Sequence, residues 1–170
     1  MNTVSAVAAL PDLWQVVYDT PWATAIRESE VLFPVLETIH VLTLGLIAGT
    51  ISVVDLRLLG FVLKDIPAGQ LERRIVPATW AGFAVMAITG SLLLASEAAK
   101  LEHNPAFLAK LALLFLAGAN VLFFQVFAHP KLEGAPTDQP LPLLVRASAG
   151  LSLIVWIGVI AAGRAVAYFH

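Results

Sequence analysis

Long apolar stretches alternate along the chain with short polar connections. Four stretches reach about 20 residues, the length that a helix needs to cross a bilayer, and they cover residues 33–54, 75–96, 106–127 and 143–163. Backbone groups in hydrocarbon must be hydrogen-bonded within the spanning segment, so each stretch predicts a helix and the connections belong at or beyond the headgroups. The pattern therefore predicts an all-α fold, an integral membrane antiparallel four-helix bundle forming one domain over residues 1–170.

The first 30 residues differ from the spans. Trp14, Tyr18 and Trp22 lie there among charged residues, which is typical of short helices at the membrane interface. No basic segment leads into a short apolar core, so we expect no cleavable signal peptide. The first span is then expected to act as an uncleaved insertion signal.

Composition narrows the class of protein. The 170 residues are 59% hydrophobic and 13% charged, with a mean hydropathy of +0.85, so the first expected partner is the lipid bilayer. A net charge of −2 gives no basic field for nucleic acid. The chain has no cysteine, which excludes thiolate metal ligands, disulfides and c-type haem attachment.

Basic residues set the expected orientation. Six lysines and arginines fall beside the first and third connections and four on the opposite side, with four of the six concentrated in the first connection. Because cytoplasmic loops carry the excess of Lys and Arg, we expect a multi-pass protein of the bacterial inner membrane with both termini on the periplasmic side. The six are Arg57, Lys64, Arg73, Arg74, Lys131 and Arg146, and the four are Arg27, Lys100, Lys110 and Arg164.

Polar groups from all four spans fall in the same outer half of the bundle. Glu37 and His40 lie early in the first span, three residues apart and so on one helix face. Ionisable residues inside a membrane are costly and by default mark a functional site facing the bundle interior. Alternatively Glu37 orients or neutralises His40, or pairs with Arg27 or Lys110, as a structural polar clasp. The further members of this outer layer are Thr89, Lys110 and Arg164, flanked by Arg27 and His103.

Ligand chemistry favours haem b in this layer. A di-iron bundle needs two Glu-x-x-His motifs and two more glutamates, whereas one such motif is present, and a copper(I) path needs Met or Cys ligands. Haem b needs one or two axial ligands and an apolar slot between helices. We therefore predict a haem b protein that transfers electrons, with His40 as axial ligand oriented by Glu37. The cations expected beside the propionates are Lys110, Arg27 and Arg164, and Thr89 with Gly90 is expected to allow close approach.

Two other functions stay open. A non-haem protein would bind or transport copper, zinc or a small polar ligand through Glu37, His40 and Lys110, with His103 as an alternative metal ligand. The chain could also be a subunit of a larger membrane oxidoreductase. A redox partner protein and a homo-oligomer are compatible with each function, and the residues leave open whether the protein is an enzyme.

Several segments resemble known families. The stretches "RESEVLFPVLETIHVLTLGLIAG", "WAGFAVMAITGSLLL" and "NPAFLAKLALLFLAGAN" resemble, over nearly the whole chain, a bacterial family of four-helix membrane proteins known only as a domain of unknown function. More distantly, "IHVLTLGLIAG", "ITGSLLLAS" and "FLAKLALLFLA" are similar to the copper resistance protein CopD group and to HemJ-type protoporphyrinogen oxidase. The HemJ resemblance implies roles in haem binding and activity for the matching His40 and Lys110.

The remaining polar and small residues have simpler interpretations. Asp55 and Arg57 are expected to form a local clasp with Arg73, Arg74 or Asn120, or else to line an inner cavity. The step "GLIAG", with Gly45 and Gly49, is typical of close helix packing. His129 and His170 are expected at the surface.

Overall fold

The computed structural model describes residues 13–132 and 139–169, and within these ranges the regular elements are all helical. The long helices are α3 (Leu32–Leu59), α4 (Ala68–Ser96), α6 (Pro105–Phe123) and α7 (Leu143–Ala165). Each is long and apolar enough to cross a membrane, α6 together with its continuation to Lys131. The predicted four-helix membrane bundle is confirmed.

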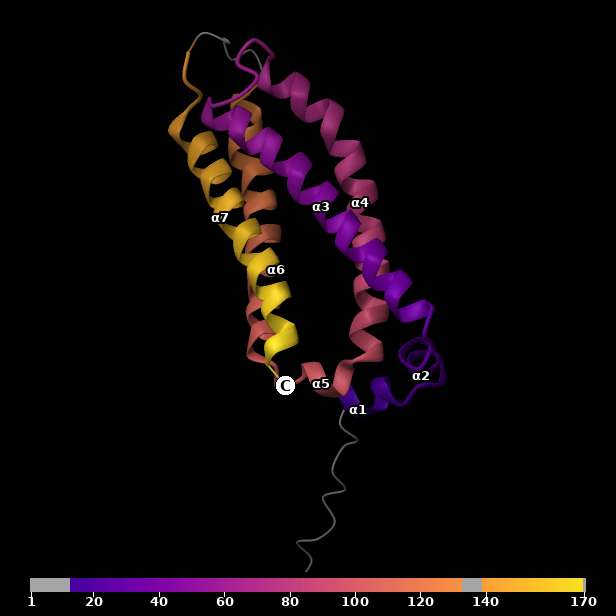
Figure 1. Ribbon diagram of the computed structural model, residues 1–170. Coiled ribbons are helices and arrows are strands. Elements are labelled where there is room, and N and C mark those ends of the chain that lie inside the picture. The colour runs from indigo at the N-terminus through magenta and orange to yellow at the C-terminus, as the bar shows by residue number, and fades with distance from the viewer. Residues whose placement is uncertain (1–12, 133–138, 170) are drawn as a thin grey trace, which may run out of the picture.

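Two hairpins make up the bundle. Helix α3 packs against both α4 and α7, and α6 packs against α7. The chain runs up and down, so the start of α3 and the C-terminus lie at the same end (Figure 1). The α3–α4 hairpin and the α6–α7 hairpin approach each other near the opposite end and diverge toward the end with the start of α3 and the C-terminus (Figure 1). We call the end with the start of α3 the outer end and the other the inner end.

Both helices of the first hairpin extend further toward the inner end than predicted. Helix α3 continues past 54 to Leu59, and α4 begins at Ala68, not near 75. Consequently Pro77, near the start of the predicted span 75–96, lies inside α4, where its ring leaves the carbonyl of Arg73 without the usual helical donor. The predicted spans stop where charged residues begin. The helices continue past these points because a helix tolerates charged residues once it leaves the hydrocarbon region of the membrane.

Local signals place the helix ends. Gly60 has φ +83°, and the amides of Gly60 and Phe61 bond back to the carbonyls of Arg57 and Leu56, which closes α3. Helix α6 begins after Asn104, whose side chain accepts from the amide of Phe107. Beyond Phe123 the helix continues as η1, a wider π-helical turn over Phe124–Ala128. It then continues as η2, a tighter 3-10 turn over His129–Lys131.

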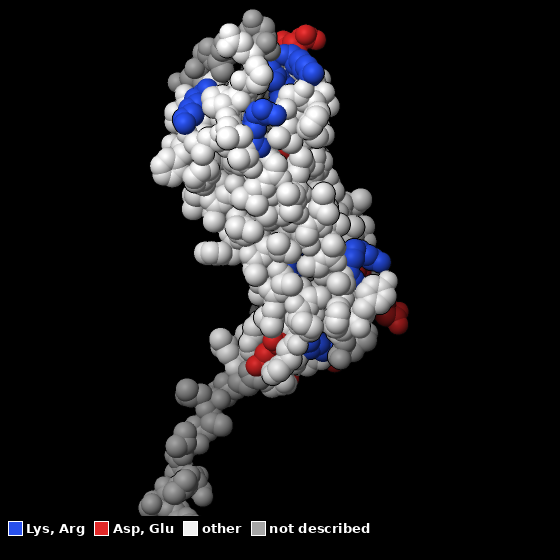
Figure 2. Space-filling model, turned by 90° about the vertical axis from the view of Figure 1, so that its left-hand side faces the viewer, with Lys and Arg blue, Asp and Glu red and all other residues white. Residues whose placement is uncertain are grey.

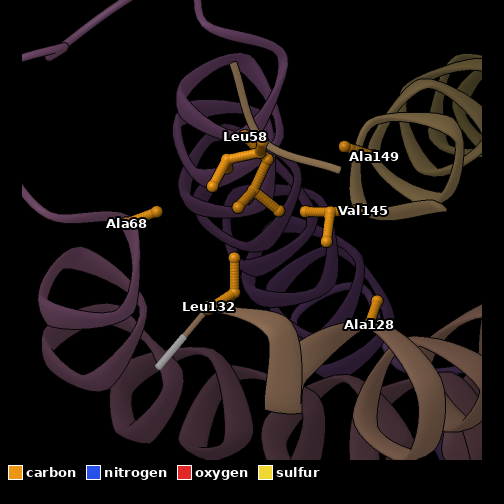
Figure 3. Close-up of a cluster of buried hydrophobic side chains, with 7 residues drawn as sticks. Leu58, Ala68, Ala128, Leu132, Val145 and Ala149 are labelled. Atoms are coloured by element: carbon orange, nitrogen blue, oxygen red, sulfur yellow. The ribbon is translucent and has the colours of Figure 1, made fainter. Parts of the chain in front are cut away.

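Two apolar clusters hold the hairpins together. The inner cluster joins α3, α4, η1 and α7 (Figure 3) and consists of Leu58, Ala68, Ala128, Leu132, Leu141, Val145 and Ala149. The second joins α3, α6 and α7 and consists of Ile47, Ala48, Ala117, Val155, Trp156 and Val159. Both clusters lie on the α3–α7 contact, so the outer half of α3 beyond Ile47 is less constrained by the other hairpin.

Short helices cover the outer end. They are α1 (Leu13–Tyr18), α2 (Pro21–Arg27), α5 (Ala98–Leu101) and, after α7, the 3-10 turn η3 (Val166–Tyr168). Helix α1 contacts α5, and α2 contacts α4 (Figure 1). The expected N-terminal helical segment is present within residues 13–27, and the rest of that prediction falls on residues 1–12, outside the described ranges. Lys and Arg side chains gather at the inner end, separated by a band without visible charge from the groups nearer the outer end (Figure 2).

Candidate functional site

His40 is held by the neighbouring helix. Its Nδ1 lies 2.9 Å from the hydroxyl Oγ1 of Thr89 on α4. That hydroxyl donates its own proton to the carbonyl of Val85 over 2.8 Å, so it serves His40 as an acceptor. Nδ1 therefore carries the ring proton, and Nε2 keeps a free lone pair. No hydrogen bond or ion pair joins Nε2 to another residue in the described part of the chain.

Gly90 makes room for the imidazole. A Cβ at this position would come within 3.0 Å of Cε1 of His40, closer than carbon atoms approach without a shift. Thr89 is buried and His40 half-buried, so α4 supplies both a hydrogen-bonding partner and a surface against which the ring rests. Thr89 and Gly90 were expected to allow close approach of the cofactor, and in the structure the imidazole of His40 rests against both residues.

The second hairpin contributes Lys110. This residue lies on α6, and a Cβ on Gly163 of α7 would be 3.8 Å from its Cδ, Cε and Nζ, so the lysine stem follows the α7 surface. Lys110 is near enough to His40 to act on it electrostatically. Its ammonium group forms no hydrogen bond or ion pair with any described residue. All four long helices thus contribute to one region of the outer half.

Glu37 is not part of this arrangement. Its side chain is exposed, and it makes no hydrogen bond or ion pair within residues 13–132 and 139–169. Positions 37 and 40 are about 60° apart around the helix, and α4 covers only the side with His40. The orientation expected from Glu37 comes from Thr89.

Arg27 has a local structural role. Its guanidinium lies 3.7 Å from the centroid of the Tyr18 ring and donates to the carbonyls of Tyr18 (3.1 Å) and Ser96 (3.2 Å) and to the hydroxyl of Thr24 (3.1 Å). It thereby ties α1 and α2 to the outer end of α4.

Arg164 and His103 are exposed residues that do not take part in holding His40. Arg164 is exposed on the last turn of α7. The His103 side chain is 87% exposed, with Nδ1 3.6 Å from a carboxylate oxygen of Glu102. Neither has a contact with His40 among the interactions of the described residues, so the structure brings together His40, Thr89, Gly90 and Lys110 from the predicted layer.

The inner half contains polar pairs that sequence reasoning missed. Nε2 of His129 lies 3.0 Å from Oε2 of the buried Glu72, and 33% of the His129 side chain is exposed. The expectation of a surface position did not include this partner. Asn120 and Ser148 exchange two hydrogen bonds between α6 and α7. Asn120 and Ser148 were visible as polar residues inside apolar spans, and Glu72 and His129 as polar residues just outside them. Neither signal reveals the partner.

Two expectations for α3 are corrected. Arg57 donates to the carbonyls of Ile66 and Lys64 in the connection to α4, so its guanidinium is not part of the expected clasp with Arg73, Arg74 or Asn120. Gly45 and Gly49 have open space at their Cβ positions and are exposed. They border a shallow groove of about 270 Å³ and do not pack against a neighbouring helix.

The side chains that could bind a metal ion are spread over the described part of the chain. No group of three His, Asp or Glu side chains gathers anywhere in the described part of the chain. A copper or zinc site from Glu37, His40 and Lys110 would have to recruit Glu37, which is exposed and has no hydrogen bond or ion pair with a described residue.

Comparison with known proteins gives a family. The model of a family of unknown function, DUF6644, matches residues 30–169. The chain belongs to this family. Neither the curated proteins nor the solved structures contain a match, so the more distant resemblance to the CopD group and to HemJ-type proteins stays a prediction. The DUF6644 match begins just before α3 and includes every residue of the His40 region.

Proposed function

We propose that this DUF6644 protein binds haem b in the outer half of its bundle and transfers electrons, with His40 Nε2 as an axial ligand. The observation that supports this most is the hydrogen bond from His40 Nδ1 to Thr89. Histidine ligands of metals usually donate their second ring nitrogen to a fixed acceptor, which sets tautomer and ring direction. Here the acceptor is in place and Nε2 has no protein partner among the described residues.

The surrounding residues fit such a cofactor. Lys110 contributes a cation without a protein partner in the described chain, and Arg164 lies exposed near the same end; either would pair with a propionate. The four spanning helices are mainly apolar, as the lining of a porphyrin site requires. When bound, haem supplies reversible one-electron chemistry at iron. The protein's own part is to hold the His40 tautomer and to balance charge through Lys110.

We place the protein in the bacterial inner membrane with the outer end facing the periplasm. The basic inner end supports this orientation through the excess of positive charge in cytoplasmic connections (Figure 2). In that arrangement an electron acceptor or donor at the periplasmic surface, or a larger oxidoreductase of which the chain is a subunit, would approach the haem most closely.

An absorption spectrum tests the proposal. The full chain would be expressed in a bacterium with ample haem supply, purified in mild detergent and measured oxidised and reduced, alongside His40→Ala. The matched control is His103→Ala, because His103 is exposed and outside the site. We expect a Soret band that shifts on reduction, persists in the control and is lost in His40→Ala.

The outcomes are separable. A wild-type protein without a Soret band overturns the haem assignment. Metal analysis of the same samples then addresses the alternative, since bound copper or zinc that disappears in His40→Ala without any haem absorbance would indicate a metal-binding or transport protein.

A further inference from the structure

Asp55 is a buried carboxyl in the inner half of the bundle that forms no ion pair with any described residue. It lies on α3, 6% exposed, and its Oδ2 is fully enclosed without a hydrogen bond to any described residue. Burying an unpaired carboxylate is costly, and in proteins such a group is usually protonated or compensated by a cation. The group that neutralises the Asp55 carboxylate therefore has to be identified.

The charged groups on the neighbouring elements do not neutralise the charge of the Asp55 carboxylate. Arg57, on the same helix, is engaged by two backbone carbonyls. On α4, Glu72 is paired with His129, and the nearby arginines are exposed. On α7 the polar neighbour of Asp55 is the hydroxyl of Ser152. No lysine, arginine or histidine of the described chain forms an ion pair with Asp55; the exposed arginines at this end are Arg73 and Arg74 of α4 and Arg146 of α7.

Comparison with the other buried polar side chains sets Asp55 apart. Asn120 and Ser148 satisfy each other, and Glu72 Oε2 has an imidazole nitrogen at 3.0 Å, which donates when it carries a proton. Glu72 Oε2 and Asp55 Oδ2 are both buried oxygens without a hydrogen bond among the described residues. Glu72, however, has the ionisable side chain of His129 within ion-pair distance. Asp55 has the hydroxyl of Ser152 beside it and no cation from the described residues, so its charge is the one that a bound proton would neutralise.

We propose that Asp55 is a proton-binding site reached from the inner end of the bundle. The space around Oδ2 is closed, which favours the smallest occupant. The step is simple: a hydronium ion at the inner surface transfers its proton to the carboxylate, an O–H bond forms on Asp55, and water is released. No electron moves, and the step requires neither haem nor any other cofactor.

Labelling with dicyclohexylcarbodiimide tests this directly, because the reagent is apolar and adds to protonated carboxyls. The full chain in detergent micelles or lipid vesicles would be treated across a range of pH, and the adduct would be located by mass spectrometry of peptides. We expect a single adduct on Asp55 that declines as pH rises and is absent in Asp55→Asn. Glu72→Gln is the matched control, since it removes the other buried inner carboxyl and should leave the Asp55 adduct in place.

Each alternative result overturns the assignment. An infrared titration of the same samples needs no reagent to enter the closed space, and it should show a protonated-carboxyl C=O band that is lost in Asp55→Asn. Absence of both the adduct and this band at every pH would overturn the assignment. Protection by sodium ions at constant pH would identify a cation site instead. Should Asp55→Asn fail to fold, peptide mapping of the wild-type adduct still decides the question. Since the readout is a mass shift, a protein without haem can pass this test, and a haem protein can fail it.

Discussion

Nδ1 of His40 on α3 donates to the hydroxyl of Thr89 on α4 across 2.9 Å, and that hydroxyl in turn donates to the carbonyl of Val85. The chain of donors ends on the backbone of α4, so the rigid helix decides which ring nitrogen of His40 carries the proton. A threonine without a helical carbonyl to bond could serve equally as donor to His40, and Nε2 would then be the protonated nitrogen. The position of Thr89 within a helix thus has a chemical consequence for His40.

Removing the Thr89 hydroxyl should weaken the cofactor site without removing its ligand. In Thr89→Val the shape is retained but Nδ1 loses its acceptor, so tautomer and ring direction are no longer set. Loss of such an outer partner typically lowers metal affinity about 10- to 100-fold. We expect a haem titration of Thr89→Val to show a loss in this range, with recovery in Thr89→Ser.

Thr79→Val is the control for that experiment. Thr79 lies on the same helix and its hydroxyl also bonds back to a helical carbonyl, that of Ile75, but it contacts Thr50 and not His40. Equal loss of haem in Thr79→Val and Thr89→Val would indicate a general effect on α4 and contradict the specific role of Thr89.

Gly90 should tolerate no side chain while His40 stays in place. In Gly90→Ala the new Cβ would lie 3.0 Å from Cε1 of His40, so the ring must move away from Thr89 or the helices must separate. Overpacking of this kind costs about 1–3 kcal/mol. We expect reversible unfolding in detergent to show that loss, together with weaker haem retention.

The same substitution at Gly118 provides the comparison. A Cβ there meets nothing within 4 Å, and alanine has the higher helix propensity, by about 1 kcal/mol. Gly118→Ala should therefore be neutral or slightly stabilising. Similar losses at both glycines would mean that backbone effects, not the contact with His40, determine the result.

Hydrophobic pattern was sufficient for the architecture but not for the pairing of polar side chains. Four apolar stretches predict four spanning helices because hydrocarbon leaves the backbone no other solution. The partner of His40 depends on how α3 and α4 are rotated about their axes. Spacing along α3 favoured Glu37, whereas the rotation places Thr89, 49 positions away, beside the ring. Glu72 beside His129 and Ser152 beside Asp55 were missed for the same reason, since these neighbours come from helices that are distant in sequence.

Asn104 should be important for the outer end of the second hairpin. Its Oδ1 caps α6 at Phe107, and its Nδ2 donates to the carbonyls of Val166 (3.0 Å) and Phe169 (2.6 Å) beyond α7. Asn104→Ala removes a cap worth about 1 kcal/mol and leaves carbonyls unpaired, at about 1–3 kcal/mol more. We expect unfolding measurements to show the summed loss and Asn104→Ser to recover only the share due to the cap. An alanine variant as stable as wild type would contradict this account.

The absence of native cysteine allows the orientation to be measured cleanly. Glu28 lies just before α3 at the outer end, and Asp65 lies in the connection between α3 and α4 at the inner end; both are exposed. Acidic residues contribute little to topology, so Glu28→Cys and Asp65→Cys should insert as the wild type does. With the basic inner end in the cytoplasm, a membrane-impermeant maleimide added to spheroplasts should label Glu28→Cys at once and Asp65→Cys only after permeabilisation. The reverse order would place both termini in the cytoplasm, and a haem held near His40 would then face cytoplasmic partners.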